Sequence, residues 1–210
     1  MSKHLGEMTN EELWALFPIV LTEYNPDWPL WYVEERETIV NALGEDVIFR
    51  VHHYGSTSVP DLTAKPTVDI LLEIREDTGI DSLIRALEQT GYITSPQPNN
   101  PPPHLLLMKG YTPAGFAEKV FHLHVRYPGD WDELYFRDWL REHPETAEEY
   151  IALKLSLKDR FRHNRDGYTE AKGMFIRAVT GNARARYDGR YQVSHENAIK
   201  KEYCDEGFSN

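Results

Sequence analysis

Cysteine, long apolar runs and positive charge are all scarce in this sequence. A single cysteine, Cys204, occurs among 210 residues, which excludes an internal disulfide framework and a zinc site built from cysteine pairs. No apolar run approaches the length that crosses a bilayer, and the first residues carry no signal-peptide pattern. Lys and Arg number 23 against 34 Asp and Glu, a net charge of −11. We therefore expect a cytoplasmic protein with no membrane partner and no broad nucleic-acid binding.

The local signatures of several enzyme classes are absent as well. The sequence contains no Walker loop, no GxGxxG fingerprint and no nucleophile elbow. Its hydrophobic content of 40% and charged content of 27% are ordinary for a soluble globular protein. The length allows one well-packed domain with a helical appendage. We expect an N-terminal extension at residues 1–17, a domain at 18–185 that is helical from about 130, and a tail at 186–210.

The most informative stretch is a polar loop between two predicted strands. Apolar runs at residues 47–49 and 68–74 are bounded by turn residues, as strands are. The loop is rich in small and hydroxyl side chains, among them Gly55, Ser56, Thr57 and Ser58. Glycine lets a ligand approach the backbone closely, and successive N–H groups can cradle a phosphate. Asp69 interrupts the second strand, and a buried carboxylate is costly unless it is paired, metal-bound or facing a cleft.

The rest of the chain reads as strands followed by helices, which predicts an α/β (α+β) fold. Besides the two strands above, the patterns predict strands at 18–21, from 92, at 104–109 and at 118–126. The last two form a hairpin with a long loop at 110–115. Helices are expected at about 9–17, 29–43, 81–90, 130–142, 144–162 and 166–185. We expect the proline-rich segment 95–103 to be a surface loop.

Two histidines share one face of a predicted strand. His122 and His124 are two residues apart, so their side chains point the same way. If their strand neighbours the Asp69 strand, the three side chains form a cluster of two histidines and one carboxylate. Such a cluster suits Zn²⁺, Mn²⁺ or Fe²⁺ better than Mg²⁺. The alternative is a pair of strand histidines with hydrogen-bonded rings and no metal.

Basic residues recur beyond the loop. Lys65, at the loop exit, is placed to meet a phosphate or carboxylate. Lys154, Lys158 and Arg162 recur every four residues, which predicts a basic stripe on one helix face, and Lys172 adds charge from the next helix. Two interpretations of this stripe are open. It lines a cleft for an anionic ligand opposite the loop, or it is a solvated helix face paired with glutamates.

The loop and strand resemble a known family. Gly55-Ser56 followed by an Asp in an apolar strand is similar to the glycine–serine and aspartate signature of the nucleotidyltransferase superfamily. Residues 54–74 resemble the central motif of the GrpB family (UPF0157), and the similarity continues through 122–125, 136–141 and 168–172. The resemblance implies a small mixed sheet with flanking helices and a helical C-terminal part. It also implies a phosphorylated small molecule or nucleotide as the partner, and Asp69 with Lys65 as catalytic residues.

Leu71 is the departure from this resemblance. A working nucleotidyltransferase usually sets two carboxylates two residues apart to hold Mg²⁺, and Leu71 occupies the second position. Glu73 is on the same face but about 13 Å from Asp69, too far to share one ion.

Three hypotheses remain open. The first is a metal-dependent (Mg²⁺, Mn²⁺ or Zn²⁺) nucleotidyl or phosphoryl transferase. The second is a non-catalytic binding module for a nucleotide or other phosphorylated metabolite. Some GrpB domains are fused to dephospho-coenzyme A kinase, so this ligand could be related to coenzyme A. The third is an interaction protein. The acceptor and the oligomeric state do not follow from the sequence.

Overall fold

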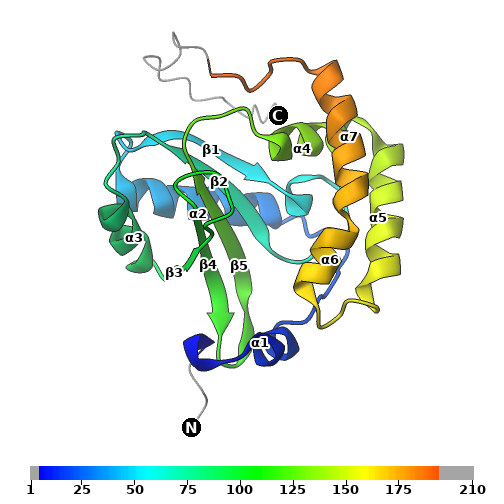
Figure 1. The fold of residues 1–210 in the computed structure, drawn as a ribbon, viewed down its shortest axis with the longest axis horizontal. Coiled ribbons are helices and arrows are strands. Elements are labelled where there is room, and N and C mark those ends of the chain that lie inside the picture. Colours follow the sequence, from blue (N-terminus) through cyan, green and yellow to red (C-terminus); the bar gives the residue numbers. More distant parts are fainter. Residues whose placement is uncertain (1–4, 194–210) are drawn as a thin grey trace.

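The computed structural model describes residues 5–193. Its elements form a mixed α/β fold in which five strands make one sheet (Figure 1). The elements are η1 (Leu5–Glu7), α1 (Asn10–Leu16), α2 (Trp28–Leu43), β1 (Ile48–Tyr54), η2 (Ser56–Ser58), β2 (Val68–Ile74), α3 (Ile80–Glu88), β3 (Ile93–Pro96), β4 (Leu105–Thr112), β5 (Gly115–Arg126), α4 (Asp132–Glu142), α5 (Pro144–Lys158), α6 (Arg165–Ala171) and α7 (Gly173–Arg186).

The sheet has the strand order β1-β2-β5-β4-β3. Only the central pair, β2 and β5, is parallel, and its register places Asp69 beside His122 and Leu71 beside His124. The other pairs are antiparallel. A parallel pair needs a long crossover, and here α3, β3 and β4 supply it. The register therefore brings together side chains that are about fifty positions apart in the sequence.

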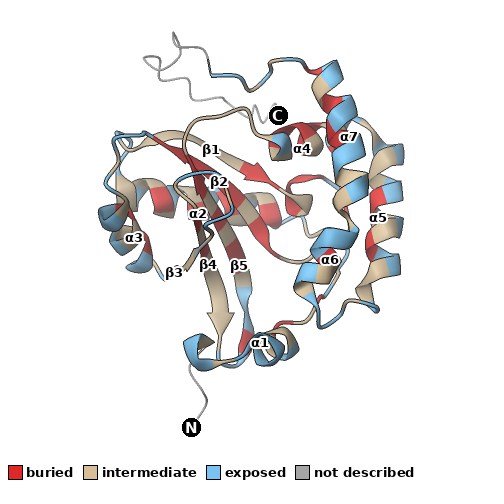
Figure 2. Ribbon diagram, viewed as in Figure 1, coloured by how far each residue is buried: buried red, intermediate tan, exposed pale blue. Residues whose placement is uncertain are grey.

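The two faces of the sheet are covered by different helices. Ile70, Leu72 and Ile74 of β2 pack with residues of α2 and α3 in the main core. The alternate residue Leu71 packs instead with Leu134 of α4 on the opposite face. Figures 1 and 2 show α2 and α3 against one side of the sheet, with α4 to α7 gathered at the other end of the molecule. The period-two pattern thus separates an apolar face from a face that carries polar groups.

Several sequence predictions about the elements are confirmed and others are corrected. The helices at 29–43 and 81–90 and the strand at 68–74 are present. Residues 18–21 are not a strand: Ile19 N–H bonds the Arg162 carbonyl, and the neighbouring Thr22 forms an isolated bridge with Ala64. The helix expected at 144–162 ends at Lys158, and the one expected at 166–185 is divided into α6 and α7.

The hairpin between β4 and β5 also differs from the prediction. The expected long loop at 110–115 is a tight turn, because β4 continues to Thr112 and β5 begins at Gly115. A shift of register beside Gly110 marks a bulge, and Gly110 has a φ of 88° where an added Cβ would overlap the Lys119 carbonyl. Bulges bend a strand and re-aim its side chains. The bulge at Gly110 lies immediately before Tyr111 and so affects where the Tyr111 side chain points.

Glu73 is a buried carboxylate of β2 whose hydrogen bonds link β2 to β1 and to the segment that precedes α4. Glu73 is 0% exposed and accepts hydrogen bonds from Arg50, the Gly129 amide and the Trp131 indole at 2.5–3.0 Å. A buried carboxylate is tolerated only when its oxygens are satisfied in this way. Glu73 is therefore a structural group, which explains its place on the Asp69 face without a role in metal binding.

No helix within residues 5–193 combines the length and the apolar character that crossing a membrane requires. The predicted tail lies outside the described residues from position 194 onward, and so does Cys204.

Replacing Glu73 with alanine should lower the free energy of unfolding by about 3–5 kcal/mol, because Arg50 loses its buried counter-charge. Urea denaturation of the purified protein measures this loss. The matched control Glu76→Ala, at an exposed position, should stay within about 0.5 kcal/mol of the unchanged protein. Equal stability of the two variants would show that the Glu73 network does not support the fold.

Candidate metal and phosphate site

Asp69, His122 and His124 converge on the polar face of the central strand pair. Each offers one ligand atom, and these atoms all lie within 4.8 Å of one another. Their side chains come from adjacent parallel strands, so the cluster depends directly on the β2–β5 register. The Nδ1 atom of His124 is buried and has no hydrogen-bond partner among the described residues. An unsatisfied buried nitrogen beside a carboxylate and a second imidazole fits a divalent cation of the Zn²⁺ or Mn²⁺ type.

Hydrogen bonds determine which nitrogen of His122 carries its proton. Arg165 donates to the Tyr111 hydroxyl at 3.2 Å, and that hydroxyl lies 2.7 Å from His122 Nε2. Because an arginine can only donate, the Tyr111 proton is left for Nε2. The Nδ1 proton then faces Asp69 Oδ1 at 3.3 Å. A metal bound at Nδ1 would require the other neutral tautomer, in which Nε2 carries the proton and faces the Tyr111 hydroxyl.

The protonation equilibria of the cluster favour a charged carboxylate and neutral rings. Burial alone would raise the pKa of Asp69, but the hydrogen bond with His122 and the nearby His124 and Lys65 hold it below its usual value. Burial lowers the pKa of His122, and it lowers that of His124 to about 3 despite the neighbouring Asp69. An ionised carboxylate and two neutral imidazoles are the forms that coordinate metal ions.

Gly55 positions the loop directly against the Asp69 carboxylate. Its φ of 70° and ψ of −173° fall in a region that is essentially restricted to glycine. A Cβ at position 55 would overlap the Asp69 carboxylate group. The turn that follows is closed by the Ser58 hydroxyl, which donates to the Gly55 carbonyl at 2.7 Å. The loop backbone therefore packs directly against the candidate metal ligand.

The loop hydroxyls divide into structural and available groups. Thr57 donates to the Thr67 carbonyl and accepts from the buried His53 ring at 3.0 Å. Ser58 is committed to Gly55, so the predicted ligand roles of the Thr57 and Ser58 side chains have no support in this geometry. Ser56 faces the helices instead: it hydrogen-bonds Tyr150 and lies 3.5 Å from Lys154 Nζ. Ser56 is thus the loop hydroxyl that lies against α5 and a lysine.

Two arginines of α4 hold the loop from the other side. Arg137 donates to the His53 carbonyl at 2.9 Å, and Arg141 donates two hydrogen bonds to the Ser58 carbonyl at 2.9 and 3.0 Å. Hydrogen bonds from charged donors are worth more than neutral ones. The predicted helix at 130–142 therefore has a definite role, which is to fix the loop beside Asp69.

Only part of the predicted basic stripe reaches the site. Lys154 is 2% exposed, and its ammonium group contacts Ser56 and the Thr63 carbonyl. Lys172 lies 4.4 Å from the centre of the Tyr168 ring. Lys158 is the last residue of α5, and Arg162 lies beyond it with an exposed side chain. The stripe is broken because α5 ends earlier than the four-residue spacing predicts.

The surroundings of Lys65, Lys154 and Lys172 disfavour the protonated, charged forms of these side chains. Burial lowers the pKa of Lys65 to about 7, with further lowering from Arg165 and Lys172 against the opposing effect of Asp69. Burial and Lys172 lower the pKa of Lys154 to about 7, and burial lowers that of Lys172 to about 8. An anionic ligand would relieve this cost by favouring the ammonium forms.

Tyr111, Tyr150 and Arg165 belong to the site but were not predicted. Position 111 was assigned to a loop, although a glycine inside an apolar and aromatic run is a known signal of a bulge. Tyr150 and Arg165 carry no local signal, because only the packing of α5 and α6 brings them near the loop.

Comparison with known proteins gives this fold and site a family. The GrpB protein family model matches residues 18–182. The chain belongs to the GrpB family. It is 36% identical over 163 residues to a UPF0157 protein of Pseudomonas aeruginosa, covering 77% of this chain and 66% of that protein. It is 31% identical over 170 residues to the UPF0157 protein YqkA of Bacillus subtilis, covering 80% of this chain and 48% of that protein.

A solved GrpB structure has the same fold. The crystal structure of the conserved protein GrpB from Enterococcus faecalis superposes with a TM-score of 0.68 at 31% identity, covering 80% of this chain and 99% of that one. This chain thus spans about half of the Bacillus relative and about two thirds of the Pseudomonas relative, but nearly all of the solved GrpB structure.

Gly55→Ala should destabilise the protein by about 1–3 kcal/mol, because alanine is strained in this backbone region. It should also weaken Mn²⁺ binding, because the added methyl group would displace Asp69. Thermal denaturation and calorimetric titration measure the two effects. Gly181→Ala is the matched control, since a Cβ there has open space. It should be neutral or up to about 1 kcal/mol stabilising, as expected within a helix. Unchanged Mn²⁺ binding by Gly55→Ala would refute the coupling between loop and carboxylate.

Sulfate should bind more weakly as the pH rises through about 7, because Lys154 and Lys65 lose their protons there while sulfate keeps its charge. Titrations between about pH 6 and about pH 9 should show a loss of about tenfold or more, the scale of a charged hydrogen bond. Lys154→Met should reduce this dependence. Lys158→Met should not, since Lys158 has no hydrogen bond or ion pair within the described part of the chain. Affinity that does not vary with pH would contradict the lysine site.

Proposed function

We propose that this protein binds a phosphorylated ligand together with a divalent metal and transfers its phosphoryl or nucleotidyl group. The observation that carries this proposal is the meeting of three metal-ligating groups with the glycine turn at Gly55. Asp69, His122 and His124 supply a carboxylate and two imidazoles, and the Gly55–Ser56 backbone approaches the same carboxylate. A metal at this position would act as a Lewis acid that stabilises charge on a transferred phosphoryl group.

The remaining groups have complementary roles in the proposal. Lys154 of α5 contacts the loop residue Ser56, so the two side chains would bind a non-transferred phosphate. Lys65 couples electrostatically to Asp69 and would neutralise charge that develops near the metal. The acidic protein concentrates positive charge here, which would attract an anion locally without favouring nucleic acid in general.

The resemblance to nucleotidyltransferases supports the same proposal with one change of ligands. The usual second carboxylate position is Leu71, which is buried against Tyr54 and Leu134. His122 and His124, on the next strand, would take over the coordination that a second carboxylate provides. A softer metal than Mg²⁺ is the consequence, because imidazole favours Zn²⁺ and Mn²⁺.

The buried Leu71 also favours a second function, a binding module that retains the cleft without the transfer step. One relative, from Mycolicibacterium paratuberculosis, is named dephospho-CoA kinase and is 28% identical over 189 residues. This chain covers 45% of that protein, so its name describes a larger molecule. It supports including dephospho-coenzyme A and coenzyme A among the ligands tested.

Metal-dependent ligand binding should be lost in Asp69→Asn. In the unchanged protein, Mn²⁺ or Zn²⁺ with a nucleotide should raise the free energy of unfolding by about 2.7 kcal/mol at a hundredfold excess over Kd. Asp69→Asn and the pair His122→Ala/His124→Ala should weaken metal binding by about 100-fold or more, since even outer-shell partners contribute about 10- to 100-fold. Thermal unfolding with and without metal measures the effect.

The exposed control Asp77→Asn should behave as the unchanged protein, and chromatographic product analysis separates the two functions. New phosphorylated or nucleotidylated product that requires Asp69 identifies a transferase. Metal-dependent stabilisation without product identifies the binding module. Stabilisation that persists in Asp69→Asn would refute the site itself.

A further inference from the structure

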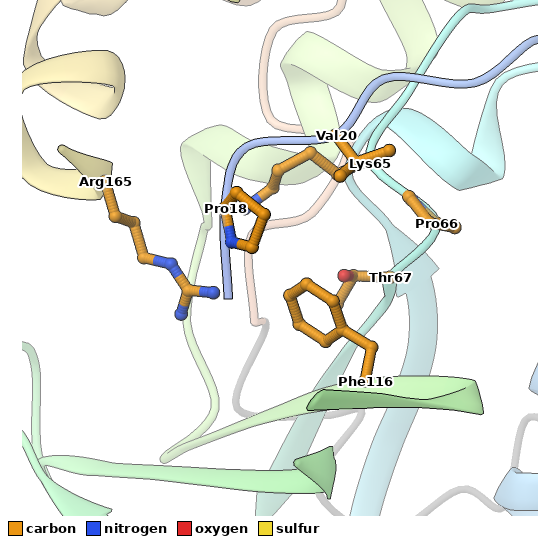
Figure 3. A pocket seen from close by; sticks show the side chains of 7 residues that line it. All are labelled: Pro18, Val20, Lys65, Pro66, Thr67, Phe116 and Arg165. Carbon is orange, nitrogen blue, oxygen red and sulfur yellow. The ribbon is translucent and has the colours of Figure 1, made fainter. Parts of the chain in front are cut away.

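A small cavity lies beside the candidate metal site and shares only Lys65 with the groups given a role in the proposed function. It is enclosed by Pro18, Val20, Lys65, Pro66, Thr67, Phe116 and Arg165 (Figure 3). Its volume is about 20 Å³, enough for roughly one water molecule or a group of similar size. The walls come from the connection after α1, the loop exit, β5 and the start of α6, so only the tertiary fold assembles them.

The polar groups of this cavity are donors without acceptors. The Nε atom of Arg165 is buried and has no hydrogen-bond partner among the described residues, although its Nη2 donates to Tyr111. Within residues 5–193, neither the Lys65 ammonium group nor the Thr67 hydroxyl makes a hydrogen bond. Figure 3 shows the Lys65 and Arg165 side chains extending toward the same space. Leaving the buried Arg165 Nε unsatisfied is costly, and a group that accepts from it would remove that cost and could accept from Lys65 and Thr67 as well.

The charges around the cavity call for an anion. Arg165, Lys172 and Asp69 are the charged groups that face Lys65, so three cations meet a single carboxylate. Asp69 is already engaged with His122. Arginine presents a planar fork of donors that matches a carboxylate or a phosphate. The limited volume favours the smaller, planar carboxylate over a tetrahedral phosphate.

The mouth of the cavity is apolar. Val20 is 41% exposed and Phe116 is 38% exposed, and both line it beside Pro18. Phe116 is held from behind by the rings of Phe17 and Tyr111, at centroid distances of 5.0 and 5.4 Å. A ring that is fixed by two neighbouring rings and remains partly exposed is suited to packing against another ring or an apolar chain.

We propose that this cavity binds the carboxylate of a second ligand whose aromatic or apolar body lies on Phe116 and Val20. Arg165 Nε, Lys65 and Thr67 would donate to the carboxylate oxygens. The ligand class is therefore an aromatic or apolar carboxylic acid. Binding of this ligand does not rest on the proposed function, because none of the three donors is a metal ligand.

Benzoate and acetate, titrated separately into the full chain by calorimetry, test the inference. Benzoate should bind at least about fivefold more tightly than acetate, because its ring buries apolar surface on Phe116. Phe116→Leu keeps the apolar bulk but removes the ring, and should reduce this preference. Arg165→Gln should weaken both acids by about tenfold, the loss of a charged hydrogen bond.

Val20 and Leu30 are both exposed apolar residues, so serine at either position should leave the fold intact and the two variants form a matched pair. Val20→Ser should lower benzoate affinity, whereas Leu30→Ser, on α2 and 58% exposed, should leave it unchanged. The inference is overturned if benzoate binds no better than acetate or not at all. A preference that survives Phe116→Leu also overturns it.

The two proposals can fail separately. If metal and nucleotide do not stabilise the protein but benzoate binds as described, the proposed transfer function fails and the carboxylate cavity stands. If nucleotide binds with metal and depends on Asp69, but benzoate does not bind, the cavity inference fails alone.

Discussion

The parallel pairing of β2 with β5 is the constraint on which the candidate site depends. Its register sets Asp69 beside His122 and Leu71 beside His124, so the three candidate ligands lie on one face of two adjacent strands. A slip of one residue would turn β5 over and move its histidines into the apolar core. Leu123 and Val125, buried against the α2 and α3 side, oppose such a slip. The apolar core therefore maintains the geometry of the polar site.

The helical part of the chain completes the site from the opposite face. Arg137 and Arg141 of α4 hold the ends of the loop segment by its carbonyls, and Lys154 of α5 approaches Ser56. Buried cations would be destabilising in an apolar interior. They are tolerated here because backbone carbonyls accept from them and, in our proposal, because an anionic ligand shares the site. Loop conformation, lysine ionisation and ligand binding are thus physically coupled.

The same face of β2 carries two carboxylates with different environments. Glu73 is enclosed by Arg50, Trp131 and Gly129, which satisfy its oxygens. Asp69 instead meets an imidazole, a glycine turn and the cavity-lining Lys65. The first environment stabilises the fold and the second leaves coordination positions for a ligand. Leu71 between them closes the sheet against α4 and separates the structural end from the candidate site.

The sequence alone was sufficient for the local features of this protein. An apolar run bounded by turn residues predicted β2, and the period of two along a strand predicted the shared face of His122 and His124. The glycine and hydroxyl pattern predicted the loop next to Asp69. These predictions succeeded because a strand period and a glycine turn are properties of neighbouring residues. The GrpB resemblance, carried by the same residues, agrees with the family match.

Other features depended on contacts between segments that are distant in the sequence. The four-residue spacing of Lys154, Lys158 and Arg162 predicted one basic face, but only Lys154 of these three contacts the loop, and Arg162 lies beyond the end of α5. Tyr111 and Arg165 reach His122 only through a strand bulge and the packing of α6. The sequence determined which side chains share a strand face or a turn. The tertiary structure decided which of them meet, because strand register, helix ends and the burial of charge are set by the packing of the whole chain.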